Sequence, residues 1–377
     1  MESEQTRRHD GILILNMKTI YCRNATRKRP VLVFITYSGL GDLIMALPLF
    51  SSLRPHFEVL PVIQSEHEDL ARLLYRDDLL EGYLLTSDSL RFRRNPLGHL
   101  RICRDLSRFR PDVLLIYGKQ ILAFAAYLGL LSAGQKLFCA PGGSARFANP
   151  SFETLTSTGN RALDNVQFAE RLGVIPMQNS VRLTPELRKE IRQAFRHSVG
   201  FSSYAVVAPW AGDPRRTAPL RFFRECTEMI TREGQLPVVV TGSPENRPDA
   251  ERLMKGLDLT SVKNLVGATS LSEMLSLLAG ARFLLANDSG NVHLARLVET
   301  PSLIFYGPTA PEQLFTDDNG DGIVPIRPGL PCSPCEYTPK RYKCPDSYLR
   351  CLRGLNGSHV KGLLQKACQS TSGGTHD

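Results

Sequence analysis

Short runs of apolar, often β-branched residues alternate with longer amphipathic stretches along the chain from residue 31 onward. In the first half, the apolar runs predict strands at 31–37, 57–64, 82–86, 112–117 and 136–139. The amphipathic stretches between them predict helices. This alternation is typical of a mainly parallel sheet that is covered by helices on both faces.

A second alternation of the same kind follows. Thr184 and Pro185 favour a helix start, with threonine as the N-cap and proline at the first helical position. This helix leads to a short loop at 197–203, where we place a domain boundary. The predicted elements beyond it are strand 204–209, a helix from 219, strand 236–241, a helix near 248, strand 262–266, helix 271–278, strand 283–286, helix 290–298 and strand 302–306.

The sequence therefore predicts two α/β domains, and a length of 377 residues agrees with two. We expect a disordered tail at 1–29, domains at 30–200 and 201–368, and a flexible tail at 369–377. The second domain ends in a cysteine-rich segment.

The formal net charge is +9, and basic residues gather in the N-terminal tail and at 91–110. Such an excess favours an anionic partner or a membrane surface. A solvated basic surface explains the same pattern. We expect no nucleic-acid partner.

The longest apolar stretch, 113–133, is interrupted by Gly118, Lys119 and Gln120, so it favours a strand and a helix over a membrane span. The apolar run at 11–17 is too short for a secretory signal. We expect a cytoplasmic protein, with peripheral association at the inner face of the membrane as an extension of this prediction. The nine cysteines then indicate thiols or metal ligands rather than a disulfide framework.

Three loops follow predicted strands, which is where doubly wound sheets bind ligands. The first contains Ser38, Gly39, Gly41 and Asp42. Its glycines permit a tight turn, and Asp42 falls in the first turn of a helix, where it either complements the helix dipole or acts as a general base. The spacing lacks the third glycine of the dinucleotide fingerprint, which disfavours a dehydrogenase.

The second loop, at 209–219, places Arg215 and Arg216 just ahead of a helix. Two adjacent arginines there either clamp phosphate oxygens or lie exposed in solvent.

The third loop, at 286–295, turns a strand into a helix. Ser289, Gly290 and Asn291 would offer backbone N–H groups at the helix N-terminus, which is an anion site. Equally, Asp288 or Ser289 caps an ordinary helix and His293 is a buried structural residue.

Together with the segment Phe305-Tyr306-Gly307-Pro308-Thr309, these loops resemble the bacterial heptosyltransferases of glycosyltransferase family nine, which transfer heptose from an ADP-sugar to the inner core of lipopolysaccharide. The resemblance runs from about residue 31 to about residue 360. It implies the GT-B fold, in which two Rossmann-like doubly wound domains face an interdomain cleft. It also implies inversion at the anomeric carbon without a catalytic metal.

The resemblance further implies roles for single residues. Asp42 matches the proposed base, Asp288 matches an aspartate that touches the donor sugar, and Ser38, Gly39 and Gly41 belong to the acceptor-side loop. Together with the local reading of the loops, this predicts a donor-binding set of Arg215, Arg216, Glu245, Asp288, Ser289, Gly290, Asn291 and His293. Two positions depart from the family: Ala218 replaces a tryptophan, and Arg216 stands where lysine is common.

Four cysteines near the C-terminus, Cys332, Cys335, Cys344 and Cys351, have the spacing C-x₂-C-x₈-C-x₆-C. They could bind a structural zinc ion tetrahedrally, but the spacing is compressed for a zinc ribbon. Free thiols or local disulfides are the alternatives.

These features predict an inverting, metal-independent glycosyltransferase that moves heptose or a related sugar from an ADP-sugar to a lipopolysaccharide core or another anionic glycan or glycolipid. A catalytically silent GT-B module that binds a nucleotide or glycan, and a GT-B epimerase acting on a UDP-sugar, are the alternatives.

Overall fold

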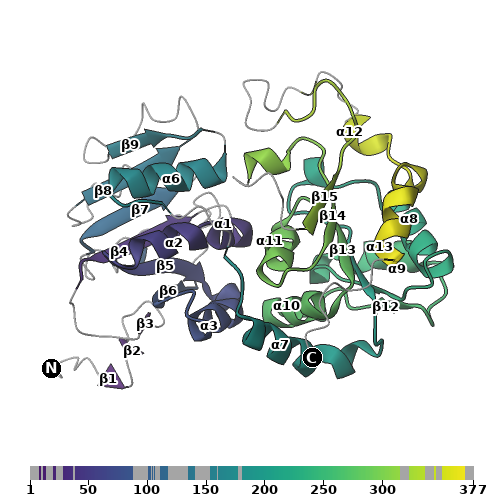
Figure 1. Cartoon of the computed structure of the whole chain (residues 1–377), viewed down its shortest axis with the longest axis horizontal. Coiled ribbons are helices and arrows are strands. Elements are labelled where there is room, and N and C mark those ends of the chain that lie inside the picture. Colours follow the sequence, from purple (N-terminus) through teal and green to yellow (C-terminus); the bar gives the residue numbers. More distant parts are fainter. Residues whose placement is uncertain are drawn as a thin grey trace. The chain divides into compact units, whose positions relative to one another are not determined.

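The computed structural model describes residues 8–9, 12–13, 20–22, 29–36, 39–87, 101–102, 104, 106, 111–117, 135–140, 153–158, 160–176, 181–314, 322–335, 344 and 350–369. The chain divides into two compact units, Met1–Val181 and Arg182–Asp377. Each unit is built on one sheet, of nine strands in the first and six in the second (Figure 1).

The sheet of the first unit has a parallel centre in the order β6-β5-β4-β7-β8-β9. Its strands are β4 (Val31–Thr36), β5 (Glu58–Gln64), β6 (Gly82–Thr86), β7 (Val113–Tyr117), β8 (Gln135–Ala140) and β9 (Glu153–Thr156). The strand order reverses at β4, because β5 and β6 follow on one side of it while β7, β8 and β9 follow on the other. Every residue of β6 and β7 is buried, as expected for strands covered on both faces.

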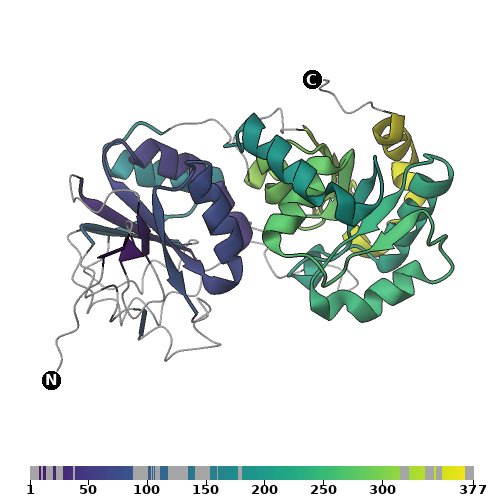
Figure 2. The same cartoon turned by 90° about the horizontal axis from the view of Figure 1, so that it is seen from below.

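The helices of this unit that the structure describes include α1 (Leu40–Met45), α2 (Leu47–Leu53), α3 (Glu68–Arg76) and α6 (Arg161–Arg171). The 3₁₀ turn η1 (Ser65–His67) directly precedes α3. Helices α2, α3 and α6 lie on one face of the sheet (Figures 1 and 2). Asn160 caps α6, and its side chain accepts hydrogen bonds from the backbone N–H of Ala162 and Leu163. Asn165 Nδ2 donates to the carbonyl oxygen of Met45 at 2.9 Å, which fastens α6 to the end of α1.

The N-terminal tail differs from the predicted disorder in three short strands, β1 (Arg8–His9), β2 (Ile12–Leu13) and β3 (Ile20–Cys22). They pair antiparallel, and β3 pairs with β6. The physical reason is that the outer edge of β6 presents backbone groups that an added strand can bond.

The sheet of the second unit is parallel throughout, in the order β12-β11-β10-β13-β14-β15. Its strands are β10 (Ala205–Ala208), β11 (Val238–Val240), β12 (Val262–Asn264), β13 (Phe283–Asn287), β14 (Ser302–Phe305) and β15 (Ile323–Ile326). The order reverses between β10 and β13. This is the doubly wound arrangement of dinucleotide-binding folds.

Helices cover both faces of this sheet (Figure 1). They are α7 (Pro185–Val199), α8 (Leu220–Arg232), α9 (Arg247–Met254), α10 (Leu271–Gly280), α11 (Gly290–Leu297), α12 (Arg350–Arg353) and α13 (Lys361–Gln369), with 3₁₀ turns η4 (Pro214–Arg216), η5 (Pro244–Asn246), η6 (Pro311–Gln313) and η8 (Gly357–Val360). Among the described residues, no helix combines the length and apolarity that crossing a membrane requires.

The boundary between the two units lies after Val181, before helix α7, and not at residue 200 as expected. Thr184 caps α7 with Pro185 at its first position, as predicted. The helix packs on α10, and the N–H of Leu183 donates to the carbonyl of Leu297 at 2.9 Å. These contacts place α7 in the second unit, so the units divide before it and not after it.

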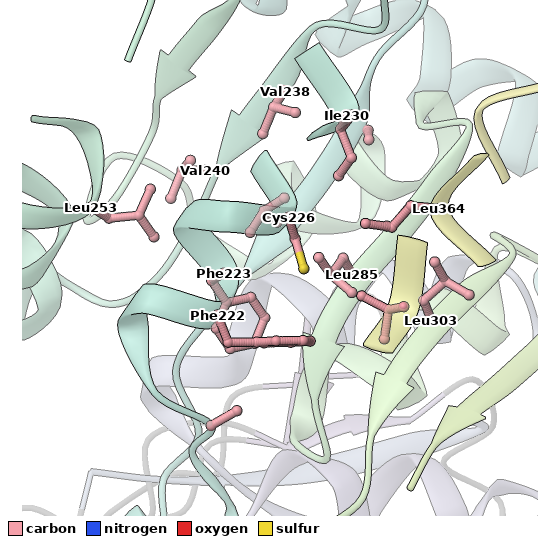
Figure 3. Packing of buried hydrophobic residues seen from close by; sticks show 14 of the residues in the cluster. Phe222, Phe223, Cys226, Ile230, Val238, Val240, Leu253, Leu285, Leu303 and Leu364 are labelled. Carbon is pink, nitrogen blue, oxygen red and sulfur yellow. The ribbon is translucent and has the colours of Figure 1, made fainter. Parts of the chain in front are cut away.

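The core on one face of the second sheet is built around α8. Phe222, Phe223 and Cys226 point from α8 toward the strands, where Leu285 of β13 lies among them (Figure 3). The Phe222 and Phe223 rings meet edge to face, with centroids 5.3 Å apart. Burying one such side chain stabilises a fold by about 1.5–3 kcal/mol. The core therefore holds α8 against β10 and fixes where the β10–α8 loop begins and ends.

Phe222→Ala tests this packing, because it removes a fully buried ring. We expect the free energy of unfolding to fall by about 3–5 kcal/mol in urea titration followed by circular dichroism. The control Leu259→Ala removes a large side chain that is 65% exposed, and it should change the free energy by about 0.5 kcal/mol or less. Similar losses for both variants would contradict the account.

Candidate functional site

The reversal of strand order marks the candidate site in the second unit. In open parallel sheets, ligands bind at the carboxyl ends of the two strands that flank this reversal. Here they are β10 and β13, which pair directly, with Ala208 opposite Ala286. The chain leaves β10 into the loop of Arg215 and Arg216, and leaves β13 into the turn of Asp288 and Ser289. Two of the three predicted loops therefore lie together.

Asp288 is the centre of this site. It is only 2% exposed, and its Oδ2 accepts a bond from Thr309 Oγ1 at 2.7 Å. The same oxygen accepts a bond from Arg216 Nη1 at 3.2 Å, and the Arg216 side chain is 24% exposed. A buried carboxylate thus holds an arginine that still reaches solvent. Contact of Asp288 with a donor sugar stays a prediction. In the structure, Asp288 holds the side chain of Arg216 in place.

The two adjacent arginines point to different partners. Arg215 Nε lies 3.0 and 3.1 Å from the two carboxylate oxygens of Asp213, and Asp213 also caps η4 by accepting from the N–H of Arg215. Burial alone would raise the pKa of Asp213, but the hydrogen bonds and charge of Arg215 outweigh it and lower the pKa. Arg215 therefore stabilises its own loop, whereas Arg216 is directed to Asp288.

Asn287 connects the two loops, a role that the sequence did not indicate. It is fully buried, its Oδ1 accepts from the N–H of Ala218 at 3.0 Å, and its Nδ2 donates to the carbonyl of Pro209. Ala218 itself precedes α8 and is buried in the hydrophobic cluster around that helix. The only signal in the sequence was a polar residue at the end of an apolar strand.

The N-terminus of α11 borders this network. Ser289 precedes α11 in an extended conformation and makes no side-chain capping bond. Its Oγ is shielded from solvent and has no hydrogen-bond partner in the structure as far as it is described. Gly290 and Asn291 lie in the first turn, where helix N–H groups have no partner within the helix. These groups are of the kind that bind an anion.

The two remaining members of the predicted donor set, His293 and Glu245, lie in α11 and in η5. His293 is buried within α11. Glu245 belongs to η5, in the loop that follows β11, the neighbour of β10. A hydrogen bond from Ser243 lowers the pKa of Glu245. Contact of Glu245 with the donor stays a prediction.

In the first unit, Asp42 lies at the equivalent reversal of strand order. Gly39, whose φ of 117° suits glycine, leads from β4 into α1, and Asp42 falls in the first turn of α1 with Gly41 beside it. Ser38 lies outside the described residues. Asp42 Oδ1 is 3.1 Å from Arg161 Nε, and both side chains are about nine-tenths buried. Sequence reasoning did not single out Arg161.

The cysteine cluster does not support structural zinc. Cys332, Cys335, Cys344 and Cys351 are free thiols, and no three or more His, Cys, Asp or Glu side chains are arranged to hold a metal ion within the described part of the chain. Burial, and then the charges of the other three cysteines, raises the pKa of Cys351 to about 11. Cys335 is held near the loop that follows β14, because its N–H donates to the carbonyl of Pro308 at 2.9 Å.

Comparison with known proteins shows which family this part of the chain resembles. The model of glycosyltransferase family 9 (heptosyltransferase) matches residues 167–345, which include the loops of Arg216, Asp288 and Thr309. The chain is related to glycosyltransferase family 9. The resemblance noted in the sequence is thereby confirmed.

Curated relatives support the same family. Lipopolysaccharide heptosyltransferase 1 of Pseudomonas aeruginosa is 36% identical over 117 residues, which cover 31% of this chain and 32% of the relative. Lipooligosaccharide heptosyltransferase 2 of Haemophilus influenzae is 31% identical over 117 residues, 30% of this chain and 33% of the relative. The chain thus aligns with about a third of the length of these curated relatives.

Solved structures share the fold over nearly the whole chain. A family 9 glycosyltransferase of Veillonella parvula has a TM-score of 0.71 at 17% identity and covers 92% of this chain and 100% of its own. The ADP-heptose lipopolysaccharide heptosyltransferase II of Escherichia coli has a TM-score of 0.63 at 15% identity and covers 90% and 98%. The predicted GT-B class, with two Rossmann-like parallel-sheet units, is confirmed.

Thr309→Val tests the Asp288 network, because it removes a hydroxyl donor from a buried carboxylate and keeps the side-chain shape. We expect a loss of about 1–3 kcal/mol in the free energy of unfolding. The matched control is Thr260→Val, which removes an equally short 2.7 Å bond to Asp258 at an exposed position, where water replaces it. Equal losses for the two variants, measured by urea titration, would show that the network contributes nothing beyond its exposed counterpart.

Proposed function

We propose that this protein is an inverting glycosyltransferase that moves heptose, or a related sugar, from an ADP-sugar to a lipopolysaccharide core or another glycan. The observation that carries the proposal is Arg216, anchored by buried Asp288 beside the N-terminus of α11. Similar proteins support the donor: Escherichia coli heptosyltransferase structures hold ADP, or ADP-2-deoxy-2-fluoro heptose, with TM-scores of 0.57 and 0.60.

The chemistry of this site suits a nucleoside diphosphate. An arginine makes strong, charge-assisted bonds to phosphate oxygens. The N–H groups that open a helix add a partial positive charge of about half an elementary charge. Because Asp288 already holds Arg216, less side-chain entropy is lost when the diphosphate binds. We assign the diphosphate to Arg216 and to the turn Ser289, Gly290 and Asn291.

The same groups assist departure of the nucleotide. As the sugar–phosphate bond breaks, negative charge grows on the diphosphate, and positive groups fixed in advance stabilise that charge. Arg216 and the α11 N-terminus supply the charge in this proposal, so no step is assigned to a metal ion.

Asp42 is the proposed general base. The acceptor hydroxyl must lose its proton as its oxygen attacks the anomeric carbon, and a positioned carboxylate contributes about 10²–10⁴-fold to such a step. The attack occurs opposite the departing diphosphate, which inverts the anomeric centre.

We further propose a cytoplasmic protein with an anionic glycan or glycolipid acceptor and peripheral association with the inner membrane face. The net charge of +9 favours such an anionic partner and surface.

A donor screen tests the proposed function. The purified protein is incubated with ADP-, UDP- and GDP-sugars, with and without a lipopolysaccharide-core acceptor. Melting temperature and nucleotide release are measured. We expect ADP to raise the melting temperature and acceptor-dependent ADP release from ADP-heptose. Tight ADP binding without release would instead favour a silent binding module, and stabilisation by UDP alone would favour an epimerase.

Arg216→Gln tests the donor site. Losing one charge-assisted contact costs about 1.5–3 kcal/mol, so the Kd for ADP should rise about tenfold or more by titration calorimetry. Arg215→Gln is the matched control, since this neighbouring arginine bonds Asp213, and its Kd should stay within a few-fold of the wild type. The reverse ranking would move the diphosphate site to Arg215.

Asp42→Asn tests the base. The amide keeps the size of the side chain but cannot take the proton, so kcat should fall by about 10²-fold or more. The Kd for ADP should stay within a few-fold, because ADP is assigned to the second unit. Unchanged turnover in the ADP-release assay would remove Asp42 from the reaction.

A further inference from the structure

Arg161 occupies an unfavourable place for a cation. It is the first residue of α6, where the helix dipole is positive, and its side chain is about nine-tenths buried. A buried charge at such a place is costly unless it is paired. The groups that contact the Arg161 guanidinium therefore indicate its role.

Asp42 and Tyr117 both contact its guanidinium. Asp42 Oδ1 lies 3.1 Å from Arg161 Nε. The Arg161 Cζ lies over the ring of Tyr117 at 3.8 Å from its centroid, which is cation–π distance. Tyr117 ends β7, the strand that pairs with β4 at the reversal of strand order. The guanidinium thus lies between the last residue of one flanking strand and the first helical turn after the other.

Tyr117 is itself fixed. Its Oη donates to Asp164 Oδ2 at 2.7 Å, and its ring meets Phe168 edge to face at 6.4 Å. Asp164 is fully buried and also accepts bonds from Ser157 Oγ at 2.5 Å and from the N–H of Thr158 at 2.7 Å. The ring therefore has one orientation, and so does the guanidinium that lies on it.

We propose that Arg161 is the positioning residue of Asp42, an inference that rests on the proposed base role of Asp42. The ion pair of Arg161 Nε with Asp42 Oδ1 fixes Oδ1 and with it the plane of the carboxylate, so Oδ2 takes the acceptor proton. In that step the acceptor O–H bond breaks and its proton moves to Oδ2. The acceptor oxygen bonds to the anomeric carbon, and the sugar–phosphate electron pair leaves with ADP.

The requirement is for arginine and not only for a positive charge. A guanidinium is planar, stacks on an aromatic ring and directs its N–H groups in a fixed fork, whereas a lysine ammonium is a point charge on a flexible chain. Arg161→Lys should therefore recover only part of the activity that Arg161→Gln loses.

The first test compares three variants in the ADP-release assay. Misplacing a catalytic group by about 1 Å costs about 10²-fold, so Arg161→Gln should lower kcat by about that factor while the KM for the donor stays within a few-fold. The matched control is Arg171→Gln, on the same helix, because Arg171 is more than half exposed and pairs with Glu153. It should keep the wild-type kcat. Wild-type kcat for Arg161→Gln or Arg161→Lys would overturn the proposal.

A double-mutant cycle separates positioning from any independent role. If Arg161 acts through Asp42, Asp42→Asn combined with Arg161→Gln should be no slower than Asp42→Asn alone. Losses in kcat that multiply would overturn the proposal. The thermal unfolding of the four proteins needs no substrate, and the loss for the double variant should be smaller than the sum of the single losses.

The two readouts distinguish the failure of this inference from failure of the proposed function. If the wild type releases no nucleotide from any donor, the proposed function is wrong, and thermal unfolding alone decides whether Arg161 positions Asp42. Additive losses in melting temperature would then overturn the pairing. If Arg161→Gln does not fold, as shown by circular dichroism, Arg161→Lys keeps the charge and takes its place in both cycles.

Discussion

The reversal of strand order in each parallel sheet is the constraint on which the candidate site depends. Right-handed crossovers send the chain to opposite faces of the sheet on the two sides of the reversal, which leaves space at the carboxyl ends of the flanking strands. In the second unit these strands are β10 and β13, and in the first they are β4 and β7. The loops that leave them carry the chemistry.

Each reversal holds an aspartate paired with an arginine. Asp288 pairs with Arg216, and Asp42 pairs with Arg161. A buried carboxylate is costly unless it is paired and hydrogen-bonded, so these pairs do not arise from packing alone. Their geometries differ in a useful way. In the second unit the arginine is the more exposed partner, which suits it to meet an anion. In the first, both partners are shielded, which suits a carboxylate whose orientation matters.

Much of the fold was predictable because apolar periodicity reports burial directly. The strands β4 to β8 and β10 to β14 all begin or end within a few residues of the predicted positions. Most of the strands that were missed lie at or near the sheet edges, where periodicity is weak. Strand β15 contains Pro325, β9 is largely polar, and β1 and β2 have only two residues each. Edge strands tolerate proline and polar residues, so their sequences resemble loops.

The loops of the site were also predictable, but their internal contacts were not. Gly39, Asp42, Arg216 and the turn at Ser289 follow apolar strands, and that position made them candidates. Arg216 and Asp288 are 72 residues apart in sequence, and no local pattern shows that they bond. The contacts of Asn287, Thr309 and Arg161 were missed for the same reason, since only the folded chain brings these residues to their partners.

A crystal structure of the protein with ADP tests the central claim most directly, because it locates the diphosphate without requiring an acceptor or turnover. The account predicts phosphate oxygens at hydrogen-bond distance from the Arg216 guanidinium and from the backbone N–H groups of Gly290 and Asn291, with the Arg216–Asp288 pair intact. A diphosphate bound elsewhere, or an Arg216 side chain turned away from it, would contradict the account.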